Sequence, residues 1–312
     1  MDKKTITIVG AYNIDLSMKC RRLPVLGETV TADRFKEGAG GKGSNQAVTA
    51  ALFGADIKFV ARVGSDSYGR YGLDLYKKVG ISTEFITVDK TVHSGIGIIL
   101  IDKDGKNMIS VAPGANLKLS REDIDHAGHV IENSTLAGFQ FENDLDTVLY
   151  GLRMAHKKGV LTFLDPAPAK NIPEDAYQYI DIIKPNETEA SMITGIKVDN
   201  ITSAESAGRW LVKRGVKTAI VTLGERGAVL VDGNTSRHFP APSVKAIDST
   251  GAGDIFSGVF MAALTSGKAM PEAIEYATAA AALSTTRLGV IDSIPSPEEV
   301  DSFILKLERN KQ

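Results

Sequence analysis

The chain has one cysteine, no apolar run long enough to cross a bilayer, and almost no net charge. Cys20 alone cannot form an internal disulfide, which fits a reducing cytoplasm. The charged start Met1–Lys4 leads into the apolar segment Thr5–Gly10, so we expect no signal peptide and a cytoplasmic protein. With 36 basic and 38 acidic residues, the net charge of -2 gives no electrostatic reason to expect nucleic acid or an anionic membrane as partner.

The arrangement of apolar segments predicts an α/β fold. A length of 312 residues allows one large core, or one core plus a small accessory piece. Short β-branched runs are expected strands, namely Thr5–Gly10, Ile57–Val63, Ser134–Phe139, Val160–Leu164, Ile180–Lys184 and Thr218–Thr222. The expected helices are Asn45–Phe53, Tyr68–Val79, Leu145–Lys157, Ala204–Arg214, Pro271–Thr286 and Pro297–Glu308. Their alternation with the strands predicts a mostly parallel sheet covered by helices on both faces.

Two stretches break this alternation. Residues 11–37 and 91–112 contain turn residues and short strand patterns such as Ser94–Ile101, but no convincing helix. We interpret them as a small β-sheet lid inserted into an α/β core made of residues 1–10, 38–90 and 113–312. A pair of long surface hairpins is the alternative, and it stays open.

The most informative motif is Asp248–Asp254, a glycine-rich turn that leads into an apolar helical segment. Backbone N–H groups at a helix start have no intrahelical partner, and together with the helix dipole they form an anion site. The carboxylate of Asp254 lies in the same turn. An anion site with its own base indicates transfer of a negatively charged group to a hydroxyl, as in a small-molecule kinase.

A second glycine-rich segment, Gly38–Asn45, precedes an expected helix. It contains the spacing G-x-G-x-x-G, but a dinucleotide fingerprint belongs directly after a core strand, and a P-loop needs Ser or Thr after the lysine. Close approach of the backbone to a polyhydroxylated ligand explains the glycines equally well, with Lys42 and Asn45 as donors. A simple tight turn before a helix remains the other interpretation.

Polar residues also follow several expected strands, on the side where open α/β sheets bind ligands. Asn13 and Asp15 alternate, so they face one way in an extended segment and suit vicinal hydroxyls, although turn residues have the same composition. Pro185–Glu189 reads as a helix N-cap that could also organise Mg²⁺ and phosphate oxygens. Two further polar segments at strand ends could belong to a nucleotide site or to ordinary loops, namely Thr222–Gly224 and Asp165–Pro168. Glu142, taken alone, is typical of an acid exposed to solvent.

Taken together, Gly40–Ala47 and Asp248–Asp254 resemble the two motifs of the ribokinase-like carbohydrate kinases, the PfkB-type family, and the resemblance spans nearly the whole chain. It implies a three-layer α/β/α core with a mostly parallel central sheet plus a small β-sheet lid. It also implies transfer of the ATP γ-phosphate to the 5-hydroxyl of a pentose, with D-ribose as the first candidate. The family's lid strands pair between subunits, which implies a homodimer.

The resemblance implies a role for each matching residue. Asp254 would be the general base, and Gly251, Ala252 and Gly253 would form the anion hole. The residues that would hold the sugar are Asn13, Asp15, Gly41, Lys42, Asn45, Glu142 and Asp254. The residues that would contact ATP are Asn186, Thr222, Gly224, Gly253 and Thr278, and Glu189 would support Mg²⁺. An activating K⁺ would bind at Asp248, Thr250, Ser284, Arg287, Gly289 and Ser293.

Several alternatives stay open at this point. The family's usual asparagine near the adenine is replaced by Thr278, which leaves the nucleotide preference undecided. A deoxyribokinase, another sugar kinase of the family and a nucleoside kinase share these motifs. An oxidoreductase would rest only on Gly38–Gly43. A non-catalytic sugar sensor on the same scaffold would have no need for Asp254.

Overall fold

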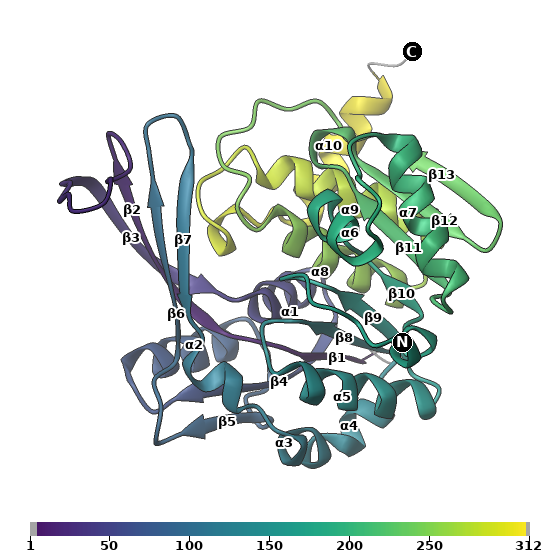
Figure 1. Cartoon of the computed structure of the whole chain (residues 1–312), viewed down its shortest axis with the longest axis horizontal. Helices are drawn as coiled ribbons and strands as arrows, with labels where there is room; N and C mark the ends of the chain where they lie inside the picture. The colour runs from purple at the N-terminus through teal and green to yellow at the C-terminus, as the bar shows by residue number, and fades with distance from the viewer. Residues whose placement is uncertain (1–4, 310–312) are drawn as a thin grey trace.

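The computed structural model describes residues 5–309, which form a large sheet between two helical layers and a smaller separate sheet (Figure 1). The large sheet has nine strands in the order β13-β12-β11-β10-β9-β8-β1-β4-β5. The pairs from β5 to β11 are parallel, and the β11–β12 and β12–β13 pairs are antiparallel. The bounds are β1 Thr5–Val9, β4 Asp56–Gly64, β5 Ile86–Asp89, β8 Leu136–Gln140, β9 Leu161–Asp165, β10 Ile182–Ile183, β11 Thr218–Thr222, β12 Ala228–Asp232 and β13 Thr235–Phe239.

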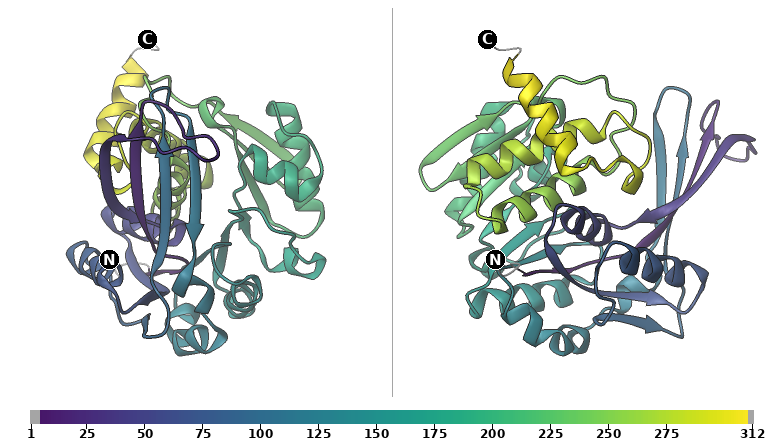
Figure 2. Two further views of the ribbon diagram at one scale, coloured as in Figure 1. Left: turned by 60° about the vertical axis from the view of Figure 1, so that its left-hand side comes forward. Right: turned by 180° about the vertical axis from the view of Figure 1, so that it is seen from behind.

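Helices cover both faces of this sheet (Figures 1 and 2). Helices α1, α8 and α9 pack together on one face, with α10 on α9, and helices α3, α5, α6 and α7 contact strands from the other. The bounds are α1 Lys42–Leu52, α2 Ser67–Lys78, α3 Arg121–His126, α4 Gly128–Glu132, α5 Leu145–Lys157, α6 Glu187–Thr194, α7 Ile201–Lys213, α8 Ala252–Thr265, α9 Met270–Ser284 and α10 Pro297–Arg309. Within residues 5–309, no helix combines the length and the apolar character needed to cross a membrane. The three-layer arrangement predicted from the sequence is confirmed.

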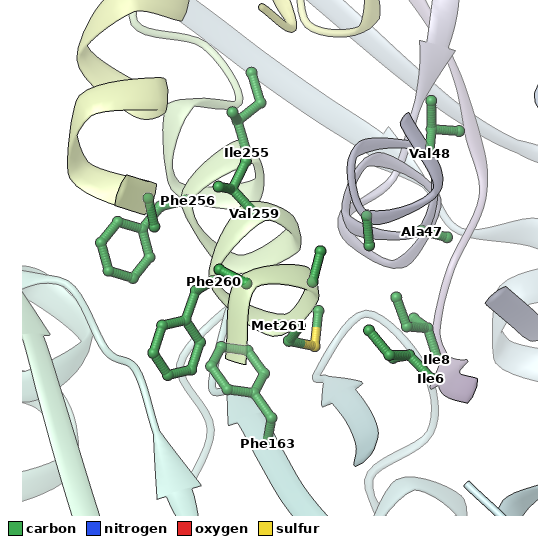
Figure 3. Packing of buried hydrophobic residues seen from close by; sticks show 14 of the residues in the cluster. Ile6, Ile8, Ala47, Val48, Phe163, Ile255, Phe256, Val259, Phe260 and Met261 are labelled. Atoms are coloured by element: carbon green, nitrogen blue, oxygen red, sulfur yellow. The ribbon is translucent and has the colours of Figure 1, made fainter. Parts of the chain in front are cut away.

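The core consists of two apolar clusters separated by the sheet. Successive strand residues point to opposite faces, so Ile8 belongs to the cluster that includes residues of α8, while the next residue, Val9, belongs to the cluster that includes residues of α5. In β9, Phe163 likewise lies against Phe260 of α8, with ring centroids 5.7 Å apart (Figure 3). Because both faces are buried, these strands are apolar throughout instead of alternating.

The second sheet has four strands in the order β3-β2-β6-β7 and stands beside the core (Figures 1 and 2). Its strands are β2 Asn13–Cys20, β3 Ala32–Gly40, β6 Gly95–Ile101 and β7 Asn107–Ala112. They come from the two stretches that interrupt the α/β alternation, so the prediction of a separate small sheet is confirmed. Strand β3 continues to Gly40, past the boundary predicted at residue 37, and leads directly into α1.

The structure differs from the sequence-based expectation at several strands of the large sheet. The strand expected over Ile180–Lys184 is reduced to Ile182–Ile183, because the side chain of Asp181 binds Thr162 and Pro185 has no N–H to donate. Strand β5 and the β12–β13 hairpin were not predicted, since they are short or, in β13, largely exposed. Residues 1–4 and 310–312 of the predicted core lie outside the described residues.

Candidate active site

A cavity of about 180 Å³ lies where the carboxyl ends of β9, β10 and β11 meet the first turns of α1, α6 and α8. Open parallel sheets bind ligands at this edge. The lining residues are Lys42, Asp165, Lys184, Asn186, Glu189, Thr222, Gly251, Gly253 and Asp254. A larger surface depression of about 370 Å³, lined by α9, α10 and Arg287, lies away from these strand ends. The smaller cavity is the candidate site because it brings together residues from both glycine-rich motifs.

Asp254 lies in the first turn of α8 and is only 6% exposed. Its Oδ2 accepts a hydrogen bond from Asn45 Nδ2 at 2.8 Å, and its Oδ1 accepts a longer one from Gln46 Nε2 at 3.4 Å. Lys42 Nζ is 3.9 Å from Asp254 Oδ1. Three residues of α1 therefore orient one carboxylate that is separated from them by about two-thirds of the chain.

The turn before Asp254 leaves backbone donors at the cavity. Gly251 has φ 75°, a left-handed conformation that favours glycine, and a Cβ there would collide with Val290. The Ala252 N–H donates to Ser249 O at 3.3 Å, so the turn already engages this donor of the predicted anion hole. Among residues 5–309, no acceptor is bonded to the N–H of Gly251 or Gly253. These two groups are therefore the best placed to receive an anion.

The predicted sugar residues gather on the lid side of Asp254. The Lys42 N–H donates to Glu142 Oε2 at 2.6 Å, and Asn13 Oδ1 accepts from Asn116 Nδ2 at 2.8 Å. Asn45 Oδ1 is buried and has no partner among the described residues, which leaves an acceptor for a ligand hydroxyl. Glu142 is partly buried rather than the solvated acid that its sequence context suggested.

The glycines of Gly38–Asn45 are explained by close backbone approach. A Cβ on Gly43 would lie 2.6 Å from Gly10 Cα, and one on Gly40 would collide with the Asp15 carboxylate. Gly38 and Gly40 lie in the antiparallel strand β3 and not in a turn after a core strand. The dinucleotide interpretation is therefore wrong, because the geometry it requires is absent from this segment.

Burial and like charge perturb two carboxyl groups of this region. Burial, with the nearby Asp254 charge, raises the pKa of Asp15 from 3.8 to about 6. Burial raises the pKa of Glu142 from 4.5 to about 7, although Lys42 acts in the opposite direction. The Asp254 charge is also the main reason why the pKa of Lys42 is raised above its ordinary value. The site thus concentrates negative charge around the ammonium group of Lys42.

The predicted nucleotide residues lie around the start of α6. Asn186 caps this helix: its Oδ1 accepts the Glu189 N–H at 2.8 Å, and Glu189 Oε2 accepts the Asn186 N–H at 2.9 Å. The capping box read from the sequence is thus confirmed. Burial raises the pKa of Glu189. Gly224 begins an exposed 3-10 turn, and Thr278 uses its hydroxyl within α9, donating to Ile274 O at 2.7 Å; neither lines the cavity.

The predicted cation residues belong to two loops that the structure brings together. Asp248 Oδ1 accepts from the N–H and hydroxyl of Thr250, and Asp248 Oδ2 accepts the Gly289 N–H at 3.0 Å. Ser284 and Ser293 bond backbone carbonyls of their own turns, and Arg287 pairs with Glu299. Arg287 thus points its charge toward an acidic partner, while the Asp248 loop and the Gly289 loop are adjacent.

Sequence reasoning missed two residues that border the site. Lys184 follows β10, and its Nζ lies 2.8 Å from Asp165 Oδ2 with both side chains buried. Gln46 donates to the same Asp165 oxygen at 2.9 Å. The sequence did contain a signal for this pair, because Lys184 follows one buried apolar strand and Asp165 ends another. Only the pairing of Ile183 with Leu164 places them side by side.

Comparison with known proteins identifies relatives over almost the full length. The profile of the pfkB family carbohydrate kinases matches residues 3–297. A ribokinase of Haemophilus influenzae is 37% identical, and the alignment covers 97% of this chain and 99% of the relative. A deoxyribokinase of Salmonella typhi is 34% identical over 96% of this chain and 98% of the relative. An Arabidopsis thaliana ribokinase, solved with ribose and ATP, has a TM-score of 0.88 at 30% identity, with coverage of 97% and 99%.

Proposed function

The chain belongs to the pfkB family of carbohydrate kinases, and we propose that it is an ATP-dependent ribokinase. The observation on which this rests most is the buried Asp254 carboxylate, held by Asn45 beside two N–H donors at the start of α8 that have no acceptor among residues 5–309. Full-length similarity to a ribokinase and to a ribokinase solved with ribose and ATP supports ribose as acceptor. Similarity to a deoxyribokinase makes 2-deoxyribose the second candidate.

In the proposed reaction, the sugar hydroxyl attacks the γ-phosphorus of ATP in line with the departing ADP. Asp254 accepts the hydroxyl proton as the new O–P bond forms, and the bond from phosphorus to the β–γ bridging oxygen breaks. Asn45 and Lys42 hold Asp254 in place for this transfer. The N–H groups of Gly251 and Gly253 stabilise charge on the phosphoryl oxygens, at typically about 3–4 kcal/mol per donor in comparable sites.

The chain offers oxygen donors that fit Mg²⁺. Glu189 uses only Oε2 in the α6 cap, and Asp165 Oδ1 is buried without a partner among the described residues. Carboxylate oxygens of this kind are preferred by Mg²⁺, which would neutralise charge on the β- and γ-phosphates. We assign the activating K⁺ to the adjacent Asp248 and Gly289 loops, where Asp248 is the charged ligand.

The proposed assembly is a homodimer formed through the lid. Strand β7 is an edge strand whose six residues are all exposed, and Met108, Ile109 and Val111 are about half exposed. An unpaired apolar edge favours pairing with another strand, and a second copy of the chain offers one. We place the enzyme in the cytoplasm, since its single cysteine needs no oxidising compartment.

A coupled ADP-release screen tests the proposal. Purified protein with Mg²⁺, K⁺ and ATP is offered ribose, 2-deoxyribose, fructose and nucleosides at equal concentrations. A ribokinase shows its highest kcat/KM with ribose, whereas a higher value with 2-deoxyribose selects the second candidate. Tight sugar binding by calorimetry without ADP release would instead identify a sensor and refute the kinase assignment.

A further inference from the structure

The cavity contains a buried lysine that none of the roles above uses. Lys184 comes directly after β10, and its side chain is only 4% exposed. Burial of an ammonium group costs several kcal/mol unless the group is paired. Lys184 is paired with Asp165 at 2.8 Å, and it is also one of the residues that line the cavity. A purely structural ion pair has no need to border a ligand cavity.

The contacts of Lys184 leave at least one donor for a ligand. An ammonium group has three N–H donors. Nζ forms an ion pair with Asp165 Oδ2 at 2.8 Å and donates one hydrogen bond, to the carbonyl of Gly253 at 3.2 Å. No third acceptor is bonded to Nζ within residues 5–309. Because Lys184 Nζ bonds the Gly253 carbonyl, its remaining N–H lies beside the first turn of α8. The N–H of Gly253, which has no acceptor among residues 5–309, lies in the same turn.

Gly253 keeps the space next to the ammonium open. A Cβ on Gly253 would lie 3.5 Å from Lys184 Nζ, so any side chain there would fill the region that both groups face. Lys42 approaches the same turn from α1, with its Nζ 3.9 Å from Asp254. Two ammonium groups from different elements therefore lie near the start of α8, one beside Asp254 and one beside Gly253.

The charge balance of the cavity also favours contact with phosphate. Its lining contains three carboxylates, Asp165, Glu189 and Asp254, and two ammonium groups, Lys42 and Lys184. The triphosphate of ATP adds further negative charge, so an approaching nucleotide meets repulsion unless cations face it. Lys42 is held beside Asp254, which leaves Lys184 as the cation on the Gly253 side.

We infer that Lys184 is a further catalytic residue, whose third N–H contacts the transferred phosphoryl group while Asp165 and the Gly253 carbonyl hold its ammonium in place. The inference rests on the proposed kinase function. In the transition state the phosphoryl oxygens lie between the Gly251–Gly253 turn and Lys184. The ammonium then stabilises negative charge that builds on these oxygens, and no bond to Lys184 is made or broken.

The test compares Lys184→Met in two backgrounds. In the natural background we expect kcat to fall by about 100-fold or more, as for loss of one charge-stabilising donor, with the sugar KM within about threefold. This variant leaves the buried Asp165 carboxylate without its ammonium partner, which lowers stability. The second comparison is therefore Asp165→Asn against Asp165→Asn/Lys184→Met, in which position 165 carries no charge in either variant.

A purely structural role for Lys184 predicts that the Asp165→Asn and double variants have equal kcat. Contact with the phosphoryl group predicts that the double variant remains at least about 30-fold slower although both fold equally well. Calorimetry supplies a second readout: Lys184→Met should weaken binding of ADP with aluminium fluoride at least about 30-fold, while ADP alone binds as before. Equal binding of both ligands by the variant and the natural protein would overturn the inference.

These outcomes are separable from failure of the proposed function. If the natural protein releases no ADP with any sugar, the kinase assignment fails. If it is active and Lys184→Met retains kcat within threefold, only the role of Lys184 fails. Lys184→Arg keeps the positive charge in a larger group, so partial recovery of kcat relative to Lys184→Met is the expected result.

Discussion

Glu142→Gln should make the free protein more stable at alkaline pH while weakening sugar binding. The Glu142 carboxyl accepts the Lys42 N–H, and a glutamine Oε1 can accept the same bond. The substitution therefore removes charge with little change in shape. Burial raises the pKa of Glu142 from 4.5 to about 7, which means that the folded protein disfavours the charged form.

The sign and size of the effect follow from this pKa. Between pH 4.5 and pH 7 the folded protein binds more protons at Glu142 than the unfolded chain, so wild-type stability falls as pH rises through this window. A shift from 4.5 to about 7 corresponds to an upper limit of about 3 kcal/mol. Solvent at the partly exposed carboxyl reduces it, and we expect Glu142→Gln to raise the free energy of unfolding by roughly 1–2 kcal/mol at pH 8.

Urea unfolding at pH 5 and pH 8 measures this difference. The stabilisation should be small at pH 5, where folded Glu142 is already largely protonated, and should reach its full value above pH 7. Glu225→Gln, at an exposed position, serves as the control and should change neither value appreciably. A Glu142→Gln variant that is no more stable than wild type at pH 8, or is stabilised more at pH 5, would refute the reasoning.

Three further predictions address the base, the α6 cap and the cation. Asp254→Asn should lower kcat about 10²–10⁴-fold with sugar affinity by calorimetry nearly unchanged, and near-normal turnover would exclude Asp254 as the base. Asn186→Ala and the control Asn200→Ala each remove a helix N-cap and should lower the free energy of unfolding by about 1 kcal/mol. Only Asn186→Ala should also raise the KM for ATP, because Asn200 lies outside the cavity; equal KM values would argue against Asn186 as a nucleotide contact. Replacing Na⁺ by K⁺ at constant ionic strength should increase the initial rate, and a rate independent of K⁺ would contradict the assignment of the Asp248 loop.

The sequence predicted those parts of the fold that depend on local pattern and burial. Strands such as Thr5–Val9 are buried on both faces and therefore read as continuous apolar runs. The cap at Asn186 could be predicted because its two partners, Asn186 and Glu189, lie within one helical turn. Strand β13, Thr235–Phe239, was missed because four of its five residues are not buried and show no alternation.

The site was less accessible to sequence reasoning, because its contacts join distant segments. The hydrogen bond from Asn45 to Asp254 spans 209 positions, and only the resemblance to a known family suggested that the two motifs meet. Lys184 and Asp165 are adjacent because β10 pairs with β9 in one register. A shift of one residue would turn the lysine to the opposite face, and no local pattern fixes that register.

The distribution of charge suggests how the free site favours its ligands. On the sugar side, Asp15 and Glu142 lie near Asp254, and burial and like charge make their charged forms unfavourable, which raises their pKa values to about 6 and 7. Sugar hydroxyls that donate to these carboxylates stabilise the charged forms, so the energy lost in the free protein is recovered on binding. On the phosphate side, Lys42 and Lys184 already face the start of α8 before ATP arrives. In the sugar-free protein, the charged carboxylates of Asp15 and Glu142 therefore lower the stability of the fold, because no hydroxyl donors reach them. Replacing these two carboxylates by amides would stabilise the fold and weaken sugar binding.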